Sequence, residues 1–257
     1  MAAFSHWHKW LPGTNPSTSR KLEKLVSTLN TANISRVGFL RHGQTGKSET
    51  GVDFDRLLTD HGRQQALQAG HSFGKLLTPF YGSLLVSPAP RTMETAQLFL
   101  DSSSVVDVGD TENNKNNNVV KLVPTPGLYD GTMQPKGSAL FRKIGYAPLK
   151  DYLENSEDEQ DQRDARQVLG AYAHVVSDSI MDVVTTNGSS GVDCTLWIVG
   201  HAIYLPAAAL GVASLARCDD LDVVLNANTR EAEGYLIDLD TKTVQYLSRG
   251  DEGPANC

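Results

Sequence analysis

Short runs of apolar residues, each ended by glycine, proline or a polar turn, predict the strands of this chain. The clearest runs are residues 35–40, 84–86, 119–123 and 196–199. Their uninterrupted apolar character is typical of strands that are buried on both faces. Near the C-terminus, residues 235–239 and 243–247 flank a polar turn at Asp240, which predicts a hairpin.

Between these runs the apolar positions follow a helical spacing. They predict helices over residues 18–30, 60–77, 91–100 and 204–215. Strands that alternate with helices indicate an α/β domain. We therefore expect a three-layer sandwich, with a mostly parallel central sheet and helices on both faces, over residues 34–250. An N-terminal arm, residues 1–33, would carry the short first helix.

Three polar stretches interrupt this pattern. Residues 109–118 are low in complexity and rich in asparagine, which predicts a flexible surface loop. Residues 154–166 are dense in acidic side chains and predict a solvated helix face or a helix start. Residues 185–193, with the letters TTNGSSGVD, predict another loop.

The composition indicates one folded domain and narrows its partners. The chain has 257 residues, of which 40% are hydrophobic, enough for a core and too many for global disorder. It has 23 Lys and Arg against 30 Asp and Glu, a formal net charge of −7. A nucleic-acid binder normally presents a basic face, so this balance argues against nucleic acid as the main partner. No apolar run reaches membrane-spanning length, about 18 residues, and we expect no membrane insertion.

The cysteines bear on the cellular compartment. Cys194, Cys218 and Cys257 are sparse, odd in number and without a C-x-x-C pair. We interpret them as reduced thiols in a cytosol-like compartment, with no structural zinc, and predict a cytoplasmic protein. The N-terminal arm carries several serines and threonines but little arginine, so organelle targeting by this arm is the alternative.

Positively charged and imidazole side chains follow three of the predicted strands. Arg41 and His42 follow the first strand, Arg91 lies shortly after the second, and His201 follows the strand at 196–199. Open α/β sheets bind ligands just beyond the carboxyl ends of their strands, so we expect these groups to converge. Arginine offers a planar fork of donors that suits phosphate oxygens. Two such forks with two imidazoles predict a pocket for a tetrahedral dianion, although each feature alone is more often a surface or turn feature.

The order of these groups and the letters around them resemble the histidine phosphatase superfamily, which also contains the cofactor-dependent phosphoglycerate mutases. The matching blocks are Arg41-His42-Gly43-Gln44-Thr45, Leu58-Thr59-Asp60-His61-Gly62-Arg63-Gln64-Gln65-Ala66, Ser87-Pro88 with Arg91, Thr95 and Ala96, and Gly200-His201. They run from about residue 34 to residue 215 and so cover most of the chain. The resemblance implies a phosphoglycerate mutase-like fold, and it leaves the substrate open.

The resemblance also implies a role for each of these side chains. His42 would take the phosphoryl group as nucleophile, giving a phosphohistidine intermediate, while Arg41, Arg91 and His201 would hold the phosphoryl oxygens, with Thr45 as a further phosphate contact. Imidazole is a good nucleophile only when it is neutral and held in one tautomer, which a backbone acceptor can enforce. His201 would work best as a cation that donates to an oxygen. The resemblance implies no metal and no other cofactor.

An acid must protonate the leaving oxygen. Many superfamily members carry Leu-x-Glu followed closely by Gly after the strand beyond the second arginine, and this chain has the letters LYDG at 128–131. Asp130 is therefore the candidate proton donor, although Tyr-Asp-Gly is also an ordinary turn. Glu94 is a rival, since it lies one helical turn past Arg91, but an acid there also suits the positive end of a helix dipole.

Departures from the superfamily pattern narrow the interpretation. Many members have Asn three residues after the Thr of the first motif, where this chain has Ser48. Residues 53–59 instead resemble the Asp-x-Arg-Pro-Leu-Thr stretch of the phosphohistidine-phosphatase-like branch, with Leu57 in place of proline. That branch is typically shorter, so residues 131–190 form an insertion that could cap the pocket and select a different phosphate ester. Residues 131–137 could contribute substrate contacts or simply lead into a helix.

Three functions are compatible with these residues. The first and preferred one is a metal-independent phosphatase that hydrolyses phosphomonoesters, or phosphohistidine, through His42. The second is a phosphoglycerate mutase-type phosphotransferase, which Ser48 and the missing mutase signatures disfavour. The third is a non-catalytic binder of phosphate ligands, against which the complete set of Arg41, His42, Arg91 and His201 argues. We expect the partner to be a small-molecule phosphate ester or a phosphoprotein.

Overall fold

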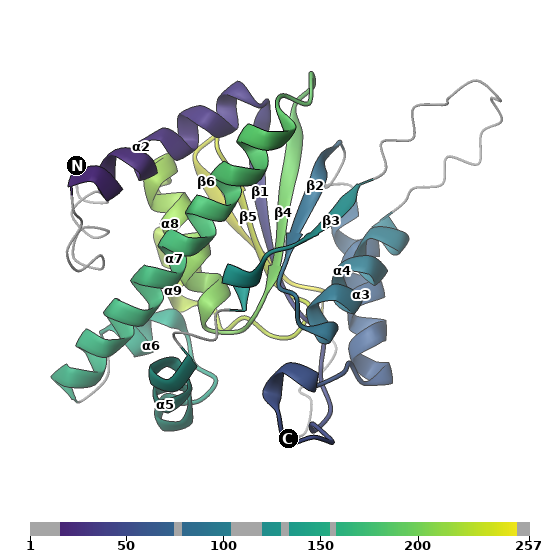
Figure 1. Cartoon of the computed structure of the whole chain (residues 1–257), viewed down its shortest axis with the longest axis vertical. Coiled ribbons are helices and arrows are strands. Elements are labelled where there is room, and N and C mark those ends of the chain that lie inside the picture. The colour runs from purple at the N-terminus through teal and green to yellow at the C-terminus, as the bar shows by residue number, and fades with distance from the viewer. Residues whose placement is uncertain (1–15, 75–78, 104–119, 130–133, 155–157, 251–257) are drawn as a thin grey trace, which may run out of the picture.

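The computed structural model describes residues 16–74, 79–103, 120–129, 134–154 and 158–250. Its centre is a six-stranded sheet in the order β3-β2-β4-β1-β5-β6 (Figure 1). The strands are β1 (Ile34–Arg41), β2 (Phe80–Val86), β3 (Lys121–Pro124), β4 (Cys194–Gly200), β5 (Gly234–Asp238) and β6 (Thr243–Leu247). β3, β2, β4 and β1 are parallel to one another, whereas β5 runs antiparallel to β1 and forms a hairpin with β6. The predicted mostly parallel sheet and the C-terminal hairpin are therefore confirmed.

A glycine fixes the register of the two central strands. Gly38 of β1 pairs with Trp197 of β4, and a side chain at Gly38 would overlap the indole ring. The same register sets Arg41 beside Gly200, so β1 and β4 end side by side. The two strands therefore present the residues that follow them at one edge of the sheet.

Two helices, α3 (Asp60–Phe73) and α4 (Pro90–Ser103), cover one face of the sheet (Figure 1). Their buried apolar side chains form one hydrophobic cluster with the strands. The helical members of this cluster are Ala69, Phe73, Ala96 and Phe99. Proline at the start of α4 is favourable, because its fixed φ suits a helix start and its missing N–H would have no partner there.

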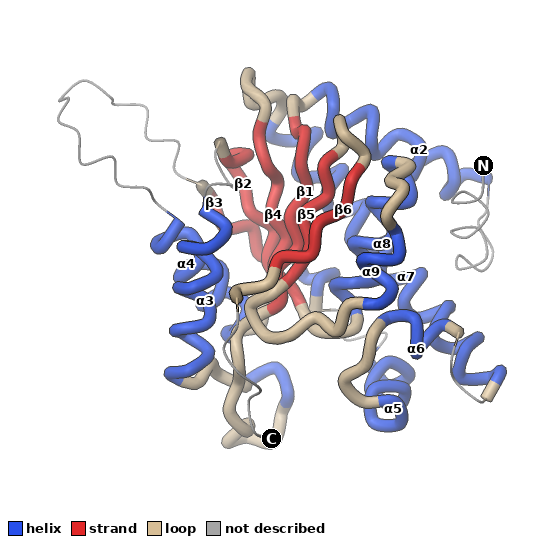
Figure 2. The backbone as a smooth tube through the Cα atoms, turned by 180° about the vertical axis from the view of Figure 1, so that it is seen from behind, coloured by secondary structure: helices blue, strands red, loops and turns tan. Residues whose placement is uncertain are grey.

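The opposite face of the sheet is covered by a second group of helices (Figures 1 and 2). They are α2 (Pro16–Thr31), α7 (Glu159–Asn187), α8 (Tyr204–Ala216) and α9 (Leu221–Asn226). α8 contacts the sheet as well as the other three helices, which explains why nearly all of its side chains are apolar and buried. Leu25 and Leu29 of α2 are fully buried, so the helix expected in the N-terminal arm packs into the main core.

The long helix α7 extends beyond its expected end. The sequence predicts a loop over residues 185–193, but α7 continues to Asn187, and the prediction is wrong over its first three residues. The helix continues because Ile180 and Val184 are buried against the core, and it ends where Gly188 takes a positive φ of 76°. α7 links β3 to β4 and covers the sheet, so the segment 131–190 is more than a cap.

Other predicted elements lie partly outside the described residues. The loop expected at 109–118 lies wholly outside them, and so does the first residue of the strand expected at 119–123, whose remainder overlaps β3. The helix expected over 60–77 is present as α3, which spans Asp60–Phe73, and residues 75–77 lie outside the described residues. The described helices include none with both the length and the apolar character that crossing a membrane requires.

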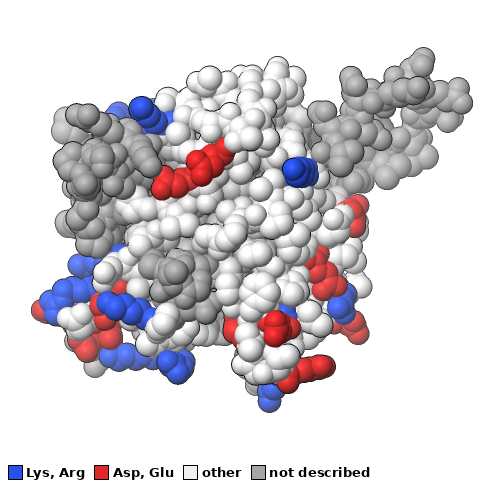
Figure 3. Space-filling model, in the orientation of Figure 1, with Lys and Arg blue, Asp and Glu red and all other residues white. Residues whose placement is uncertain are grey.

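From residue 158 onward the acid-rich stretch forms a helix start, which is one of its two predicted forms, and residues 155–157 lie outside the described residues. Asp158 caps α7, because its side chain accepts a hydrogen bond from the backbone N–H of Gln160 at 2.8 Å. Basic side chains of α5 (Gln134–Ile144) pair with this region, as Lys143 does with Asp161. Charged side chains of both signs gather at this end of the molecule, whereas the upper part of the face in Figure 3 carries few.

The helices α5 and α6 (Leu149–Leu153) lie at the end of the molecule where the parallel strands end (Figures 1 and 2). Both pack against α7. Two short 3-10 turns complete the described elements, η1 (Asp53–Asp55) and η3 (Pro126–Leu128). The segment expected as an insertion therefore supplies two helices next to the edge where the candidate residues emerge.

Candidate active site

His42 directly follows β1, and its imidazole is buried. Its Nδ1 lies 2.7 Å from the carbonyl oxygen of Gly43. A carbonyl oxygen can only accept, so Nδ1 carries the proton and Nε2 keeps its lone pair. Burial lowers the pKa of His42 well below its ordinary value, and repulsion from Arg41 and Arg91 lowers the pKa further, against the effect of the Gly43 hydrogen bond. His42 is therefore a neutral imidazole held in one tautomer.

The loop that sets this tautomer is itself held by two side chains. The N–H of Gln44 donates to Oε1 of Gln65 at 2.8 Å, and the N–H of Gly43 donates to the hydroxyl of Thr95 at 3.1 Å. Because a backbone N–H can only donate, the atom of Gln65 that faces Gln44 is its oxygen. Gln65 and Thr95 belong to the second and third sequence motifs, so these motifs hold the loop that follows the candidate nucleophile.

Two motif glycines allow this loop to approach α3 closely. A side chain at Gly43 would overlap the carbonyl of Gly62, and a side chain at Gly62 would overlap backbone atoms of Gln44. Thr59 caps α3 by accepting from the N–H of Gly62 at 3.0 Å, and its own N–H donates to the carbonyl of Gln44 at 3.0 Å. The first two motifs therefore contact each other through their backbones, Gly43 and Gln44 on one side and Thr59 and Gly62 on the other.

The two arginines of the site are buried, with 3% of Arg41 and 4% of Arg91 exposed. Arg41 donates to the carbonyl of Thr229 at 2.7 Å and to the carboxylate of Glu231 at 2.8 Å. Arg91 donates to the carbonyl and the carboxylate of Asp53, at 2.6 and 2.7 Å. The Nε atom of each guanidinium has no acceptor among the described residues. A buried donor without an acceptor is costly, so each guanidinium is short of one acceptor.

His201 directly follows β4, and its ring centroid lies 5.3 Å from that of His42. Its Nε2 lies 2.7 Å from the hydroxyl of Ser87, and its Nδ1 lies 3.4 Å from a terminal nitrogen of Arg91. A guanidinium nitrogen can only donate, which makes Nδ1 the acceptor and places the proton on Nε2. Burial, and then repulsion from Arg91, lowers the pKa of His201 to about 3. His201 is thus neutral in this structure, and the expected cation that donates to a phosphoryl oxygen stays a prediction.

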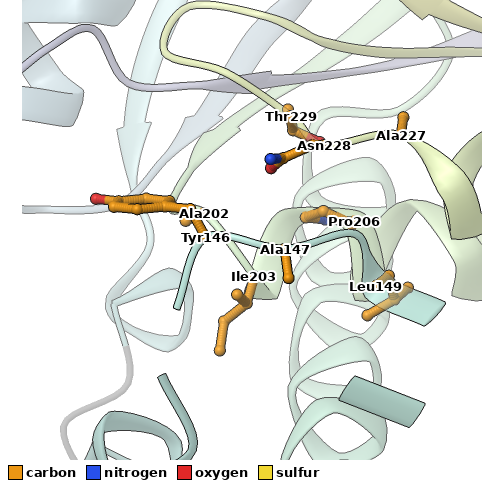
Figure 4. A pocket seen from close by; sticks show the side chains of 9 residues that line it. All are labelled: Tyr146, Ala147, Leu149, Ala202, Ile203, Pro206, Ala227, Asn228 and Thr229. Carbon is orange, nitrogen blue, oxygen red and sulfur yellow. The ribbon is translucent and has the colours of Figure 1, made fainter. Parts of the chain in front are cut away.

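Arg41, His42, Arg91 and His201 line one cavity of about 280 Å³. The cavity is bounded as well by Asp53 and Tyr129, by α5 with the turn after it, and by the start of α8. A much smaller pocket adjoins it and shares the residues Tyr146, Ala202 and Ile203 (Figure 4). The structure therefore brings together the four side chains that the sequence singled out, and places α5 across from them.

The remaining candidate residues are not part of this group. Thr45 pairs with Leu58 in an isolated bridge and does not line the cavity, so its contact with phosphate stays a prediction. Asp130 lies outside the described residues. Glu94 pairs with Arg63 at 2.6 Å and does not line the cavity. Among the described residues, no cluster of three His, Cys, Asp or Glu is arranged to hold a metal ion.

Sequence analysis did not identify the side chains that contact the arginines, among them Asp53, Glu231 and Tyr146. Asp53 pairs with Arg91. It lies in residues 53–59, whose only sequence signal was their resemblance to the phosphohistidine-phosphatase-like branch. Partial burial works to raise the pKa of Asp53, but attraction from Arg91 and from a second arginine of its own loop outweighs it and lowers the pKa. Glu231 binds Arg41 from a loop with no motif, and the ring of Tyr146 lies over the same guanidinium at 4.8 Å.

Several solved structures are similar to this chain. An ecdysone phosphate phosphatase from Bombix mori is 18% identical with a TM-score of 0.48, over 86% of this chain and 95% of that chain. A phosphoglycerate mutase from Bacillus anthracis str. Sterne is 16% identical with a TM-score of 0.47, over 86% and 94%. A mycobacterial glucosyl-3-phosphoglycerate phosphatase is 17% identical with a TM-score of 0.47, over 82% and 97%.

A family model gives the more specific match. Residues 37–113 match the histidine phosphatase superfamily (branch 1). This segment contains Arg41, His42 and Arg91 with their surrounding motifs, whereas His201 lies beyond it. No curated protein matches the chain. The resemblance that the motifs indicated is therefore confirmed: this chain carries, over residues 37–113, the sequence pattern of the histidine phosphatase superfamily.

Proposed function

We propose that this protein is a phosphatase that hydrolyses phosphomonoesters, or phosphohistidine, through a phosphohistidine intermediate on His42 and without a metal ion. The observation that carries this proposal is the hydrogen bond between Nδ1 of His42 and the Gly43 carbonyl at 2.7 Å. It leaves Nε2 with a free lone pair in a cavity that two buried guanidiniums also line. A neutral imidazole held in one tautomer beside arginines suits attack on a phosphoryl group.

The reaction would proceed in two balanced steps. In the first, Nε2 of His42 attacks phosphorus, a P–N bond forms, and the bond to the leaving oxygen breaks with its electron pair. The leaving oxygen takes a proton from an acid of the enzyme. In the second step, water attacks phosphorus, the P–N electron pair returns to Nε2, and a proton of that water restores the acid. The products are an alcohol and orthophosphate.

The cations of the site would stabilise charge on the transferring oxygens. Arg41 and Arg91 each have an Nε–H without an acceptor among the described residues, and phosphoryl oxygens would supply acceptors. Binding of a phosphate dianion would raise the pKa of His201 from its value of about 3. The expected cationic His201 would thus form only when substrate binds, because the added negative charge favours the protonated ring.

Labelling of His42 tests the proposal directly. Wild-type enzyme incubated with ³²P-labelled substrate and quenched in alkaline detergent is expected to retain label that is stable in alkali and lost in acid, while His42→Ala retains none and loses on the order of a million-fold in rate. His71→Ala, which removes an exposed histidine of α3, is the matched control and keeps label and rate. Label on His201, or no label under rapid quenching, would contradict the assignment. Transfer of label between phosphoglycerate isomers instead of to water would identify a mutase.

Asp130 is the proton donor that we propose for the leaving oxygen. An alkyl alkoxide needs that proton in the transition state, whereas nitrophenolate hardly does. Asp130→Asn is therefore expected to slow hydrolysis of an alkyl phosphate by about a hundredfold and to leave 4-nitrophenyl phosphate close to wild type. Equal losses on both substrates would assign Asp130 a structural role.

We further propose that the substrate is a small phosphate ester met in the cytoplasm. The cysteines among the described residues, Cys194 and Cys218, are buried free thiols, which suits a reducing compartment. Cell fractionation against cytosolic and organellar markers tests the location. Recovery with an organelle would instead support the targeting alternative for the N-terminal arm.

A further inference from the structure

The cavity is larger than a phosphoryl group requires. Its volume of about 280 Å³ approaches the range of small-molecule pockets, about 300–1,000 Å³. Arg41, His42, Arg91 and His201 form only part of its lining. The remainder of the cavity is therefore available to the part of a substrate that leaves with the alcohol oxygen.

Aromatic and aliphatic side chains form the larger part of this remainder, and its polar side chains are Asp53, Arg56, Ser138 and Arg142. The largest aromatic and aliphatic side chains are Tyr129, Phe141, Tyr146, Ile203 and Tyr204. Among the described lining residues there is no Asn, Gln, Glu or Lys, and Asp53 is the single carboxylate. A sugar or another polyol could pair hydroxyl groups only with Asp53, Arg56, Ser138, Arg142 or the tyrosine hydroxyls. Hydroxyl groups left against the faces of the aromatic rings would be buried without partners, which costs free energy. The lining thus favours an apolar leaving group over a polyhydroxylated one.

Tyr146 holds an aromatic ring over the phosphate end of the cavity. Its ring lies 4.8 Å from the guanidinium carbon of Arg41 and meets the ring of Phe141 edge to face, at 4.8 Å between centroids and 87°. Although these contacts position the ring, 57% of Tyr146 is exposed. In Figure 4 the ring lies beside Ala202, where the large cavity adjoins the small pocket. A planar apolar ligand would cover this exposed ring.

We propose that the preferred substrates are phosphate monoesters of aromatic alcohols, with the phosphate at His42 and the ring against Phe141 and Tyr146. This inference rests on the proposed phosphatase function and adds its substrate class. Phe141 lies in α5 and Tyr146 in the turn after it. Both specificity-determining side chains therefore come from residues 131–190, the segment by which this chain exceeds the typical length of the phosphohistidine-phosphatase-like branch. Removal of one aromatic ring from water gives about a ten- to hundredfold preference in kcat/KM.

A comparison of primary phosphate esters tests the inference. 2-Phenylethyl, n-propyl and glycerol 1-phosphate all release primary alcohols, so differences in kcat/KM report binding of the leaving group. The phenylethyl ester is expected to exceed the other two by about ten- to a hundredfold. Equal kcat/KM values with label on His42 would overturn the substrate class and leave the phosphatase intact. Absence of both turnover and label with all three would overturn the phosphatase itself.

Substitutions at Tyr146 and Phe141 locate the preference. Tyr146→Ala is expected to reduce the ratio of phenylethyl to propyl kcat/KM by about three- to tenfold, while Tyr146→Phe, which keeps the ring, retains it. Phe141→Ala is expected to reduce the same ratio. Because Phe141 also packs on the core, the melting temperature of this variant is measured alongside. Val192→Ala removes another exposed apolar side chain, 55% exposed and outside the cavity, and serves as the matched control. An unchanged ratio in Tyr146→Ala would overturn the proposed contact.

Discussion

The tautomer of His42 depends on a single peptide group. The carbonyl of Gly43 accepts the proton of Nδ1, and the N–H at the other end of the same peptide, that of Gln44, donates to Gln65. Rotation of this peptide would withdraw the acceptor and allow the imidazole to exchange tautomers. Gln65 is buried and does not line the cavity, so it acts as a positioning residue.

Replacement of Gln65 tests this dependence. Gln65→Met keeps the side-chain size but leaves the Gln44 N–H without its acceptor, a cost of about 1–3 kcal/mol that rotation of the peptide would relieve. We expect kcat/KM to fall about tenfold, and the ¹⁵N shifts of the His42 ring to show two tautomers. Gln65→Glu keeps an oxygen acceptor and is expected to restore the single tautomer. One tautomer in Gln65→Met would contradict the positioning role.

The low pKa of His201 makes stability depend on pH. The folded protein keeps His201 neutral to about pH 3, whereas the unfolded chain protonates it near its ordinary pKa of about 6.5. Between about pH 3 and pH 6.5 the unfolded state therefore binds more protons than the folded state does. As far as His201 is concerned, the free energy of unfolding is highest above about pH 6.5 and decreases as the pH falls below that value. At pH 5 we expect His201 to cost about 2 kcal/mol of the free energy of unfolding. Urea unfolding at pH 7 and pH 5 measures it, and His201→Gln should show a correspondingly smaller difference.

At the scale of elements, the site depends on how closely β1 and α3 approach. The loop after β1 and the first turn of α3 meet through backbone atoms at Gly43 and Gly62. Thr59 joins them from the other side by hydrogen bonds to both Gly62 and Gln44. A change at this contact therefore moves the helix and the nucleophile's loop together.

Gly62→Ala is expected to impair both stability and activity. Its methyl group would overlap backbone atoms of Gln44, which cannot move aside as a flexible side chain could. We expect a loss of about 1–3 kcal/mol in the free energy of unfolding, measured in urea, together with a lower kcat. Gly82→Ala is the control, because nothing lies within 4 Å of the added atom. A Gly62→Ala variant that is destabilised but has a normal kcat would show that this contact does not affect catalysis.

Elements with a local pattern could be predicted, and those set by distant contacts could not. β1, β4 and α8 follow apolar runs or spacings, and the motif residues at their ends converge as expected. The end of α7 depends instead on burial of Val184 in the core, which no local pattern encodes. The partners of the arginines escaped for the same reason: Glu231 lies 190 residues from Arg41 in the chain, and no pattern near it marks the pairing.

At the scale of the whole molecule, the site is a positive region in an acidic protein. The chain carries 30 Asp and Glu against 23 Lys and Arg, so an anionic substrate meets an excess of negative charge outside the cavity. Within the cavity the carboxylate of Asp53 already occupies a terminal nitrogen of Arg91 at 2.7 Å. Phosphate oxygens that bind this nitrogen must therefore displace an internal competitor.

Asp53→Asn is expected to strengthen binding of orthophosphate. The neutral amide competes less well for Arg91, so the inhibition constant for this product should fall about fivefold, the scale of a partly exposed ion pair. Product-inhibition kinetics measure it. Asp55→Asn is the control, since Asp55 lies in the same 3-10 turn but bonds Thr50. A higher inhibition constant in Asp53→Asn would mean that Asp53 orients Arg91 for phosphate instead of competing with it.

The fit of Gly38 beneath Trp197 has a consequence for inactivation by heat. A shift of one residue between β1 and β4 would move His42 about 3.3 Å relative to His201, far beyond the roughly 0.5 Å that a catalytic arrangement tolerates. Such a shift would also bring a side chain into the space of the indole ring. The spacing of His42 and His201 is thus kept for as long as the centre of the sheet stays folded. Thermal loss of activity should accordingly coincide with global unfolding of the sheet, without an earlier phase in which an otherwise folded enzyme has lost its alignment.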